Sequence, residues 1–258
     1  MQGFPYRLEQ RSTQTALIEA LSEHLERCLR QRLQAADFTK PLGLATGRTM
    51  EPLYAALVRR LNRWPESDLA ALRRGWLSFN LDEYLGLQSQ DPRSYRWFMD
   101  HHLGHPLGLS TSALRLPDGT RDDGTASACS YAQELQQQGG IGLQLLGLGS
   151  NGHIGFNEPP CSEDLSCRVV TLSDATRDQN AAMFGGDAAA VPARAITLGL
   201  QEILAADEIH LVVTGAAKAQ ILGALMKAPE PDVHLPASWL GRHGQVWLWA
   251  DADALNHS

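Results

Sequence analysis

The sequence predicts an α/β fold, built as a mostly parallel open sheet with helices on both faces. Two observations predict it. Apolar segments of strand length alternate along the chain with segments whose leucines recur at helical spacing. The 258 residues, 43% hydrophobic and 20% charged, suffice for one large core, and no repeat or flexible linker divides them. A single domain spanning residues 1–258 is therefore expected.

The first third of the chain predicts helix, strand and helix. Residues 12–36 are expected to form a helix that begins at Ser12 or Thr13, because leucines recur there every four residues. These are Leu17, Leu21, Leu25, Leu29 and Leu33. The stretch "KPLGLATGRT" (40–49) predicts a short strand and a turn rich in glycine and threonine. "MEPLYAALVRRLNR" (50–63) predicts the next helix.

The middle and the end repeat this alternation. Strands are expected in 76–87, 112–116, 141–149, 194–197, 208–215 and 244–251. Helices are expected in 91–105, in 125–138 up to Gly139, in 199–206 and from about Ala216 onward. Because strands and helices alternate along the chain, the predicted fold is Rossmann-like.

Composition excludes several classes of function. The net charge is −7 and no block of lysine or arginine stands out, so neither nucleic acid nor an anionic membrane is expected as a partner. No apolar run reaches the roughly 18–20 residues of a membrane span, and the N-terminus lacks a secretion signal. A cytoplasmic protein is expected. Its four cysteines have no CxxC spacing and are expected to be reduced thiols; they are Cys28, Cys129, Cys161 and Cys167.

Two polar clusters after predicted strands suit a phosphate. Thr46, Gly47, Arg48 and Thr49 lie between a strand and a helix, where free backbone N–H groups, hydroxyls and a guanidinium can bind an anion. Lys218 is expected at a helix start, where a cation opposes the helix dipole unless it binds an anion. An ordinary strand-to-helix turn and a solvated lysine remain the alternatives, and neither a Walker nor a GxGxxG motif is present.

Two further clusters suit proton transfer. Asp82 and Glu83 are adjacent on an expected strand end, so alternation sends them to opposite sides, one as a base and one as a structural acceptor. In "GLGSNGHIGFNEP" (147–159), His153 follows Asn151 and precedes Glu158, a pairing that can fix an imidazole for acid–base work. The alternatives are that Asp82 and Glu83 cap a helix or form a surface pair, and that His153 is a loop histidine without a function. No GxSxG elbow predicts a hydrolase triad, and no zinc cluster is expected.

These motifs resemble, in order and spacing, the glucosamine-6-phosphate deaminase (isomerase) family. The resemblance runs from about residue 40 to about residue 222 through "LGLATGRT", "FNLDEYLGL", "PRSYRWFM", "GLGSNGHIGFNEP" and "ITLGLQEILAADEIHLVVTGAAKA". "HLPASWL" (234–240) looks closer to the galactosamine-6-phosphate branch. The related 6-phosphogluconolactonases share the sheet and the "GH" but lack the "FNEP" extension.

The resemblance implies isomerisation of an amino-sugar phosphate with loss of ammonia and without a cofactor or metal. It implies that Asp82 moves a proton between C2 and C1, that His153 opens the sugar ring beside Asn151, and that Glu158 orients His153. The phosphate would be held by the residues Thr46, Gly47, Thr49 and Lys218. A lactonase-type hydrolase and a non-catalytic sugar-phosphate sensor remain the alternative functions.

The sequence departs from the family pattern at the phosphate and at a regulatory site. Ala182 stands where an arginine is expected to bind phosphate, and Arg48 is the candidate replacement cation. Asn151 stands where some members have aspartate. Arg168 matches a basic group of the allosterically activated members, but Val170 falls where a lysine is expected, so such activation is not expected. The expected partner is a small amino-sugar phosphate, and a homo-oligomer is one expectation for the assembly.

Overall fold

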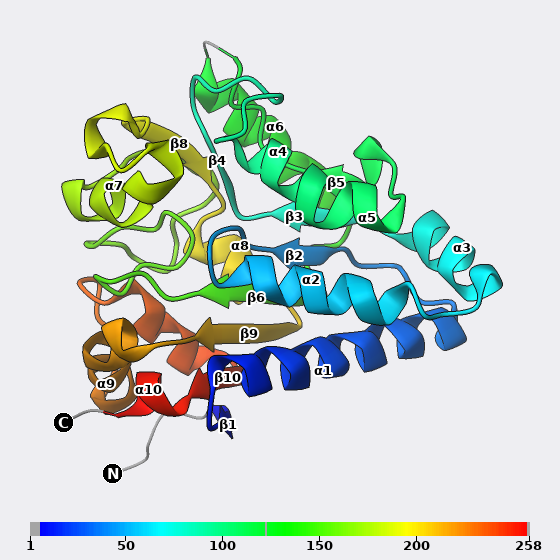
Figure 1. Ribbon diagram of the computed structural model, residues 1–258. Helices are drawn as coiled ribbons and strands as arrows, with labels where there is room; N and C mark the ends of the chain where they lie inside the picture. The colour runs from blue at the N-terminus through cyan, green and yellow to red at the C-terminus, as the bar shows by residue number, and fades with distance from the viewer. Residues whose placement is uncertain (1–5, 122, 257–258) are drawn as a thin grey trace.

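The centre of the molecule is a seven-stranded sheet in the order β1-β10-β9-β6-β2-β3-β5, seen in a computed structural model that describes residues 6–121 and 123–256 (Figure 1). Every strand pair in it is parallel. Its strands are β1 (Arg7–Arg11), β2 (Leu42–Leu44), β3 (Ser78–Asn80), β5 (Leu114–Arg115), β6 (Leu143–Gly147), β9 (Glu208–Val213) and β10 (Val246–Asp251). The predicted fold class is therefore confirmed.

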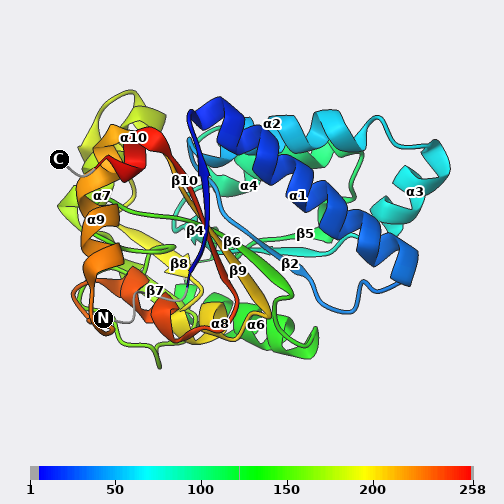
Figure 2. The same ribbon diagram turned by 90° about the horizontal axis from the view of Figure 1, so that it is seen from below.

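Helices cover the two faces of this sheet. Figure 2 shows α1 and α2 on one face and α6 and α8 on the other, with α9 and α10 at one end. The helices are α1 (Gln14–Ala35), α2 (Met50–Leu61), α3 (Glu66–Gly75), α4 (Tyr95–Met99), α5 (His105–Leu107), α6 (Gly124–Gln137), α7 (Asp174–Asn180), α8 (Leu200–Leu204), α9 (Ala219–Lys227) and α10 (Ala252–Leu255). None of the helices in these residues has both the length and the apolar character that a membrane crossing requires.

The first helix shows how the leucine pattern becomes core. Thr13 is its N-cap and accepts a hydrogen bond from the backbone N–H of Ala16, as one of the two expected starts. The leucines at four-residue spacing face the sheet, and Leu17 and Leu21 are fully buried. Burial of such side chains contributes about 1.5–3 kcal/mol each, which stabilises the helix far more than its intrinsic propensity does.

The predicted strand at 76–87 is wrong in one respect: it is two strands in two sheets. β3 ends at Asn80, and β4 (Asp82–Tyr84) pairs antiparallel with β8 (Arg194–Thr197), which also pairs with β7 (Arg168–Thr171). Leu81 joins the sheets, since its N–H donates to the Leu44 carbonyl and its own carbonyl accepts from Leu198 N–H. Asp82 therefore begins a strand of the small sheet instead of ending one of the large sheet.

The predicted helix over 91–105 is also interrupted. It consists of α4, a π-helical turn over Asp100–Gly104 and the short α5. Pro106 has no N–H to continue an α-helical ladder, and His105 N–H donates to the Asp100 carbonyl, five residues back. The helix expected from Ala216 begins instead at Ala219, after a 3₁₀ turn that contains Lys218.

The order of the strands creates a crevice at one edge of the sheet. The chain runs outward through β2, β3 and β5 and then returns to β6, on the other side of β2. Loops that follow β2 and β6 therefore diverge, and such switch points are where open α/β sheets bind ligands.

Candidate active site

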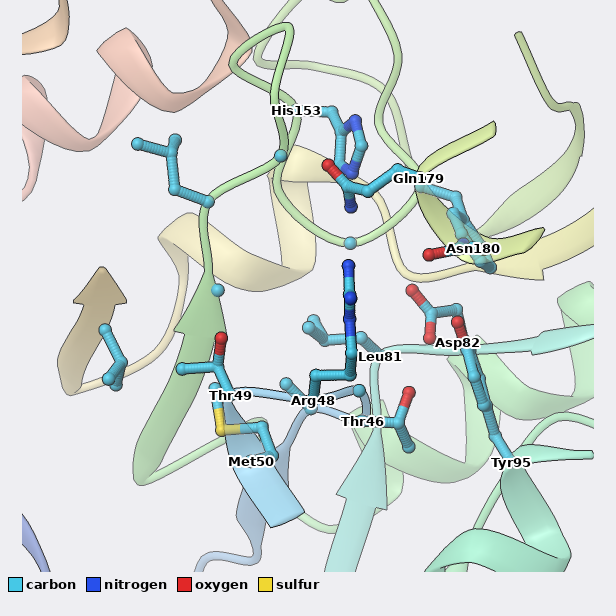
Figure 3. Close-up of a pocket in the computed structure, with 18 of the residues that line it drawn as sticks. Thr46, Arg48, Thr49, Met50, Leu81, Asp82, Tyr95, His153, Gln179 and Asn180 are labelled. Atoms are coloured by element: carbon cyan, nitrogen blue, oxygen red, sulfur yellow. The ribbon is translucent and has the colours of Figure 1, made fainter. Parts of the chain in front are cut away.

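A pocket lies beyond the carboxyl ends of β2, β3, β6 and β9, at the switch point. All the residues predicted to hold phosphate line it, together with two of the predicted proton-transfer groups. These residues are Thr46, Gly47, Arg48, Thr49, Asp82, His153 and Lys218. Figure 3 labels five of these residues, namely Thr46, Arg48, Thr49, Asp82 and His153. Asn151 and Glu158 lie behind His153, where they reach it through hydrogen bonds. The structure thus brings together residues from four segments of the chain.

Asp82 faces this pocket with its carboxylate unpaired. Only 6% of the residue is exposed, and no residue in the described chain donates a hydrogen bond to its side chain. Burial raises the pKa of Asp82 well above its ordinary value, and the neighbouring charge of Glu83 adds to the rise. A buried carboxylate with a raised pKa is a stronger base once ionised.

Glu83 points the other way and has a structural position. Its carboxylate accepts hydrogen bonds from the backbone N–H groups of Tyr84, Tyr95 and Arg96, at 2.8, 3.0 and 2.8 Å. It thereby fixes the N-terminus of α4, which follows Ser94, to β4. Burial raises the pKa of Glu83 to about 7, against the effect of the three N–H groups. The two carboxylates lie on opposite sides of the strand, as strand alternation predicts.

His153 is held by a chain of polar groups that leads away from the pocket. Its Nδ1 lies 2.6 Å from Asn151 Oδ1, and Asn151 Nδ2 donates to Glu158 Oε2 over 2.8 Å. Ser173 Oγ also donates to Glu158 Oε2, over 3.1 Å. Although burial opposes the change, hydrogen bonds from Thr176, Asn151 and Ser173 lower the pKa of Glu158. An ionised Glu158 thus anchors this series of hydrogen bonds.

The hydrogen bonds from Glu158 through Asn151 to His153 select one tautomer of the imidazole. Because the Asn151 amide nitrogen donates to a carboxylate, its oxygen faces His153 and can only accept. Nδ1 of His153 must therefore carry the proton, which leaves the lone pair of Nε2 for the pocket. Burial lowers the pKa of His153 below its ordinary value, Glu158 opposes this change and Lys218 adds to it. The neutral ring can take up a proton at Nε2 and return it.

Two glycines permit this arrangement. The ring of His153 lies against the α-carbon of Gly149, where any β-carbon would overlap the ring atoms. Gly47 has a φ of +104°, a conformation that residues with a β-carbon rarely adopt. The first glycine places the imidazole, and the second turns the chain into α2.

The turn before α2 offers donors for an anion. Thr49 precedes the helix, yet its side chain makes no capping hydrogen bond, so its hydroxyl is not used as a cap. The backbone N–H groups of Arg48 and Thr49 donate to no described residue. At this helix start, free N–H groups, a hydroxyl and the Arg48 side chain face one pocket.

Lys218 brings a second positive charge to the same end of the pocket. Its Nζ donates to Gln179 Oε1 over 3.1 Å. Burial and the charge of Arg48 lower the pKa of Lys218 to about 8. Arg48 and Lys218 are thus close enough to repel each other, and an anion bound between them would relieve the repulsion.

The lowered pKa of Lys218 predicts how anion binding depends on pH. Lys218 loses its positive charge as the pH rises through about 8, so affinity for inorganic phosphate should fall above that pH. Phosphate binding can be measured by calorimetry between pH 7 and pH 9.5. In an Arg48→Ala variant the fall should move to higher pH, because the repulsive charge is gone. An affinity that is constant to pH 9.5 would contradict a role for Lys218.

Comparison with known proteins decides the family. The family model described as glucosamine-6-phosphate isomerases/6-phosphogluconolactonase matches residues 12–249. The chain belongs to this family. Among its relatives, a glucosamine-6-phosphate deaminase of Halalkalibacterium halodurans is 42% identical over 221 residues, which cover 85% of this chain and 86% of the relative. A glucosamine-6-phosphate deaminase of Streptomyces coelicolor is 39% identical over 236 residues, covering 92% and 86%.

Solved structures with a similar fold include a deaminase and a lactonase. A structure described as a monomeric glucosamine-6-phosphate deaminase, a "missing link of the NagB superfamily", matches with a TM-score of 0.81 and 32% identity, covering 96% of this chain and 98% of that one. The 6-phosphogluconolactonase from Trypanosoma cruzi matches with a TM-score of 0.74 over 98% and 97%. Its identity of 18% shows a shared fold alone.

The structure shows where the residues that depart from the expected family pattern lie relative to the pocket. Ala182 lines the pocket in the 3₁₀ turn after α7 and brings no charge there. Arg168 lies in β7, donates to Asn157 Oδ1 over 3.0 Å and does not line the pocket. Most of the other lining residues were not predicted from the sequence, and those with polar side chains include Tyr95, Gln179 and Asn180. Asn180 Nδ2 donates to the hydroxyl of Tyr84, which contacts that of Tyr95.

One group outside the pocket has the composition of a metal site. Within the described chain, His24, Glu208 and His210 bring ligand atoms within 4.8 Å of one another. However, Trp249 donates its indole N–H to His210 Nδ1 over 2.9 Å, so Nε2 of that ring carries the proton that it gives to Glu208. A protonated nitrogen is no ligand. The group is arranged instead as a hydrogen bond from His210 to Glu208 within β9 and an ion pair between Glu208 and His24 of α1, whose Nε2 lies 3.6 Å from the Glu208 carboxylate. All four cysteines are free thiols.

Proposed function

We propose that the chain is an amino-sugar phosphate deaminase that converts glucosamine 6-phosphate to fructose 6-phosphate and ammonia. The observation that carries the proposal is a buried, unpaired carboxylate, Asp82, and a tautomer-fixed imidazole, His153, in one pocket with two cations. The named deaminases that are 39–42% identical support the same reaction. Nothing in this chemistry requires a cofactor.

In the proposed mechanism, His153 acts first. Nε2 accepts the proton of the C1 hydroxyl and returns a proton to the ring oxygen, which breaks the bond between C1 and that oxygen and opens the pyranose. Glu158 and Asn151 hold the imidazole and stabilise its transient positive charge. The product of this step is the open-chain amino aldehyde.

Asp82 then isomerises the open chain. Its carboxylate removes the proton from C2, which the neighbouring aldehyde acidifies, while the aldehyde oxygen takes a proton from the substrate's ammonium group. Asp82 then delivers its proton to C1 of the resulting enolamine. The resulting imine at C2 adds water and loses ammonia, which leaves a ketone. The substrate's ammonium group favours the ionised form of Asp82, offsetting the burial that raises its pKa. The binding energy of the distant phosphate positions C1 and C2 over this base.

A lactonase-type hydrolase and a sensor without catalysis are weaker proposals. A sensor needs no buried unpaired base, and a lactonase needs no proton carrier between adjacent carbons. The pocket offers such a group in Asp82. We further propose a cytoplasmic protein in one domain, able to form a homo-oligomer.

The decisive test is release of ammonia from glucosamine 6-phosphate, with galactosamine 6-phosphate and 6-phosphogluconolactone in parallel. Ammonia and fructose 6-phosphate are expected from the first substrate. Preference for the galacto epimer would correct the sugar, and hydrolysis of the lactone alone would replace the proposed reaction.

Arg48→Ala tests the replacement cation. A charge-assisted hydrogen bond contributes about 1.5–3 kcal/mol, so KM for glucosamine 6-phosphate should rise roughly ten- to hundredfold. Unphosphorylated glucosamine should lose almost nothing, because the contact is to phosphate only. Steady-state kinetics with both substrates measure the effect. A similar rise in KM with both substrates would show that Arg48 does not contact the phosphate and is a solvated side chain.

A further inference from the structure

The side chain of Gln179 joins the two loops that carry the cation and the imidazole. Its Oε1 accepts a hydrogen bond from Lys218 Nζ over 3.1 Å and another from the backbone N–H of Ser150 over 3.0 Å. Ser150 belongs to the loop of His153, and Lys218 to the turn before α9. Figure 3 shows Gln179 reaching into the pocket between His153 and Arg48.

The group that holds Lys218 is an amide and not a carboxylate, and this difference matters for charge. No acidic group contributes to the lowered pKa of Lys218, whose causes are burial and Arg48. A carboxylate at the same place would form an ion pair with Lys218 and cancel the attraction for an anion. The amide fixes the direction of the ammonium group and leaves its charge uncompensated.

The remaining donors of these groups point to an anionic ligand. An ammonium group has three N–H donors, so Lys218 gives one to Gln179 and keeps two. The Nε2 of Gln179 donates to no described residue and is a further donor for an anionic oxygen. Ala182, one turn further along the chain, adds no charge. Gln179 thus adds an uncharged donor to a pocket that lacks the arginine expected from the sequence resemblance.

We propose that Gln179 is a positioning residue that directs Lys218 toward the phosphate of the substrate and keeps its charge available for binding. The identity of the substrate rests on the proposed function, whereas recognition of a phosphate group does not. Gln179 does not touch the reacting carbons in this role, so it sets KM and the selectivity for phosphorylated over unphosphorylated sugars, with little effect on kcat.

Gln179→Glu separates this role from a merely structural one. The new carboxylate retains and strengthens both hydrogen bonds, so a structural role predicts an equally stable protein that binds normally. The positioning role predicts an unchanged or raised Tm. It also predicts that KM for glucosamine 6-phosphate rises on the order of a hundredfold, because the new carboxylate repels the phosphate of the substrate. Stabilisation by inorganic phosphate in a thermal melt should be lost in parallel. kcat/KM for glucosamine should stay within about threefold.

Gln220→Glu is the matched control, since Gln220 is exposed on α9 two residues after Lys218. It adds the same charge and should leave KM within about twofold. Gln179→Met, which removes the acceptor without adding charge, should raise KM about tenfold. Normal phosphate binding in a folded Gln179→Glu protein, or equal losses with glucosamine and its 6-phosphate, would overturn the proposal. A wild-type protein that binds phosphate through Gln179 but releases no ammonia would overturn the proposed function alone.

Discussion

Replacing Asp82 by asparagine is expected to lower kcat for ammonia release by about 10²–10⁴-fold, the usual contribution of a general base. The amide has the same shape as the carboxylate but cannot accept the C2 proton. Substrate binding should persist, because Arg48, Thr49 and Lys218, which we propose to hold the phosphate, are unchanged. Ammonia release in the steady state and inhibition by inorganic phosphate measure the two effects.

Isotope transfer from solvent gives this prediction a second readout. In D₂O the wild-type protein should place solvent deuterium at C1 of fructose 6-phosphate, since the proton on Asp82 exchanges before delivery. The Asp82→Asn variant should form no labelled product above background. Its free energy of unfolding should not decrease, because the substitution removes a buried charge beside Glu83. Near-normal turnover with deuterium incorporation intact would show that another group is the base.

The parallel sheet and the place of the Thr46–Thr49 turn in the pocket could be predicted because their signals are local. β2 is an apolar run followed at once by the Thr46–Thr49 turn and by a helix with an apolar face. Asp82 and Glu83 were predicted on opposite sides of a strand from alternation alone, and they are. In each case one short segment contains both the structural signal and the chemical group.

The features that were not predicted depend on contacts between distant segments. β4 belongs to the small sheet because its partner β8 lies more than a hundred residues later. The polar segment "RLEQR" becomes β1 only because β10 offers it a free edge. Helix α7 has seven residues, too few for a periodic pattern, and Gln179 gains its position from Lys218, 39 residues away. A single sequence does not encode these pairings in any short stretch.

Replacing His153 by glutamine is expected to affect the cyclic substrate far more than an open-chain one. The wild-type imidazole presents Nε2 to the pocket because Asn151 Oδ1 occupies Nδ1, while Glu158 holds the amide of Asn151. A glutamine side chain can form hydrogen bonds there but cannot carry a proton between two oxygens. kcat for glucosamine 6-phosphate should therefore fall by about 10²–10⁴-fold.

An analogue methylated on both the C4 and C5 oxygens can close neither the five-membered nor the six-membered ring and serves as the open-chain substrate. With it, kcat should fall less than about tenfold in the His153→Gln variant, because Asp82 still moves the proton between C2 and C1. Asp82→Asn should lose activity on both substrates, which makes it the matched comparison. This pattern assigns ring opening to His153 and isomerisation to Asp82 as separate steps. Equal losses on the two substrates in His153→Gln would instead make the imidazole a binding or structural group.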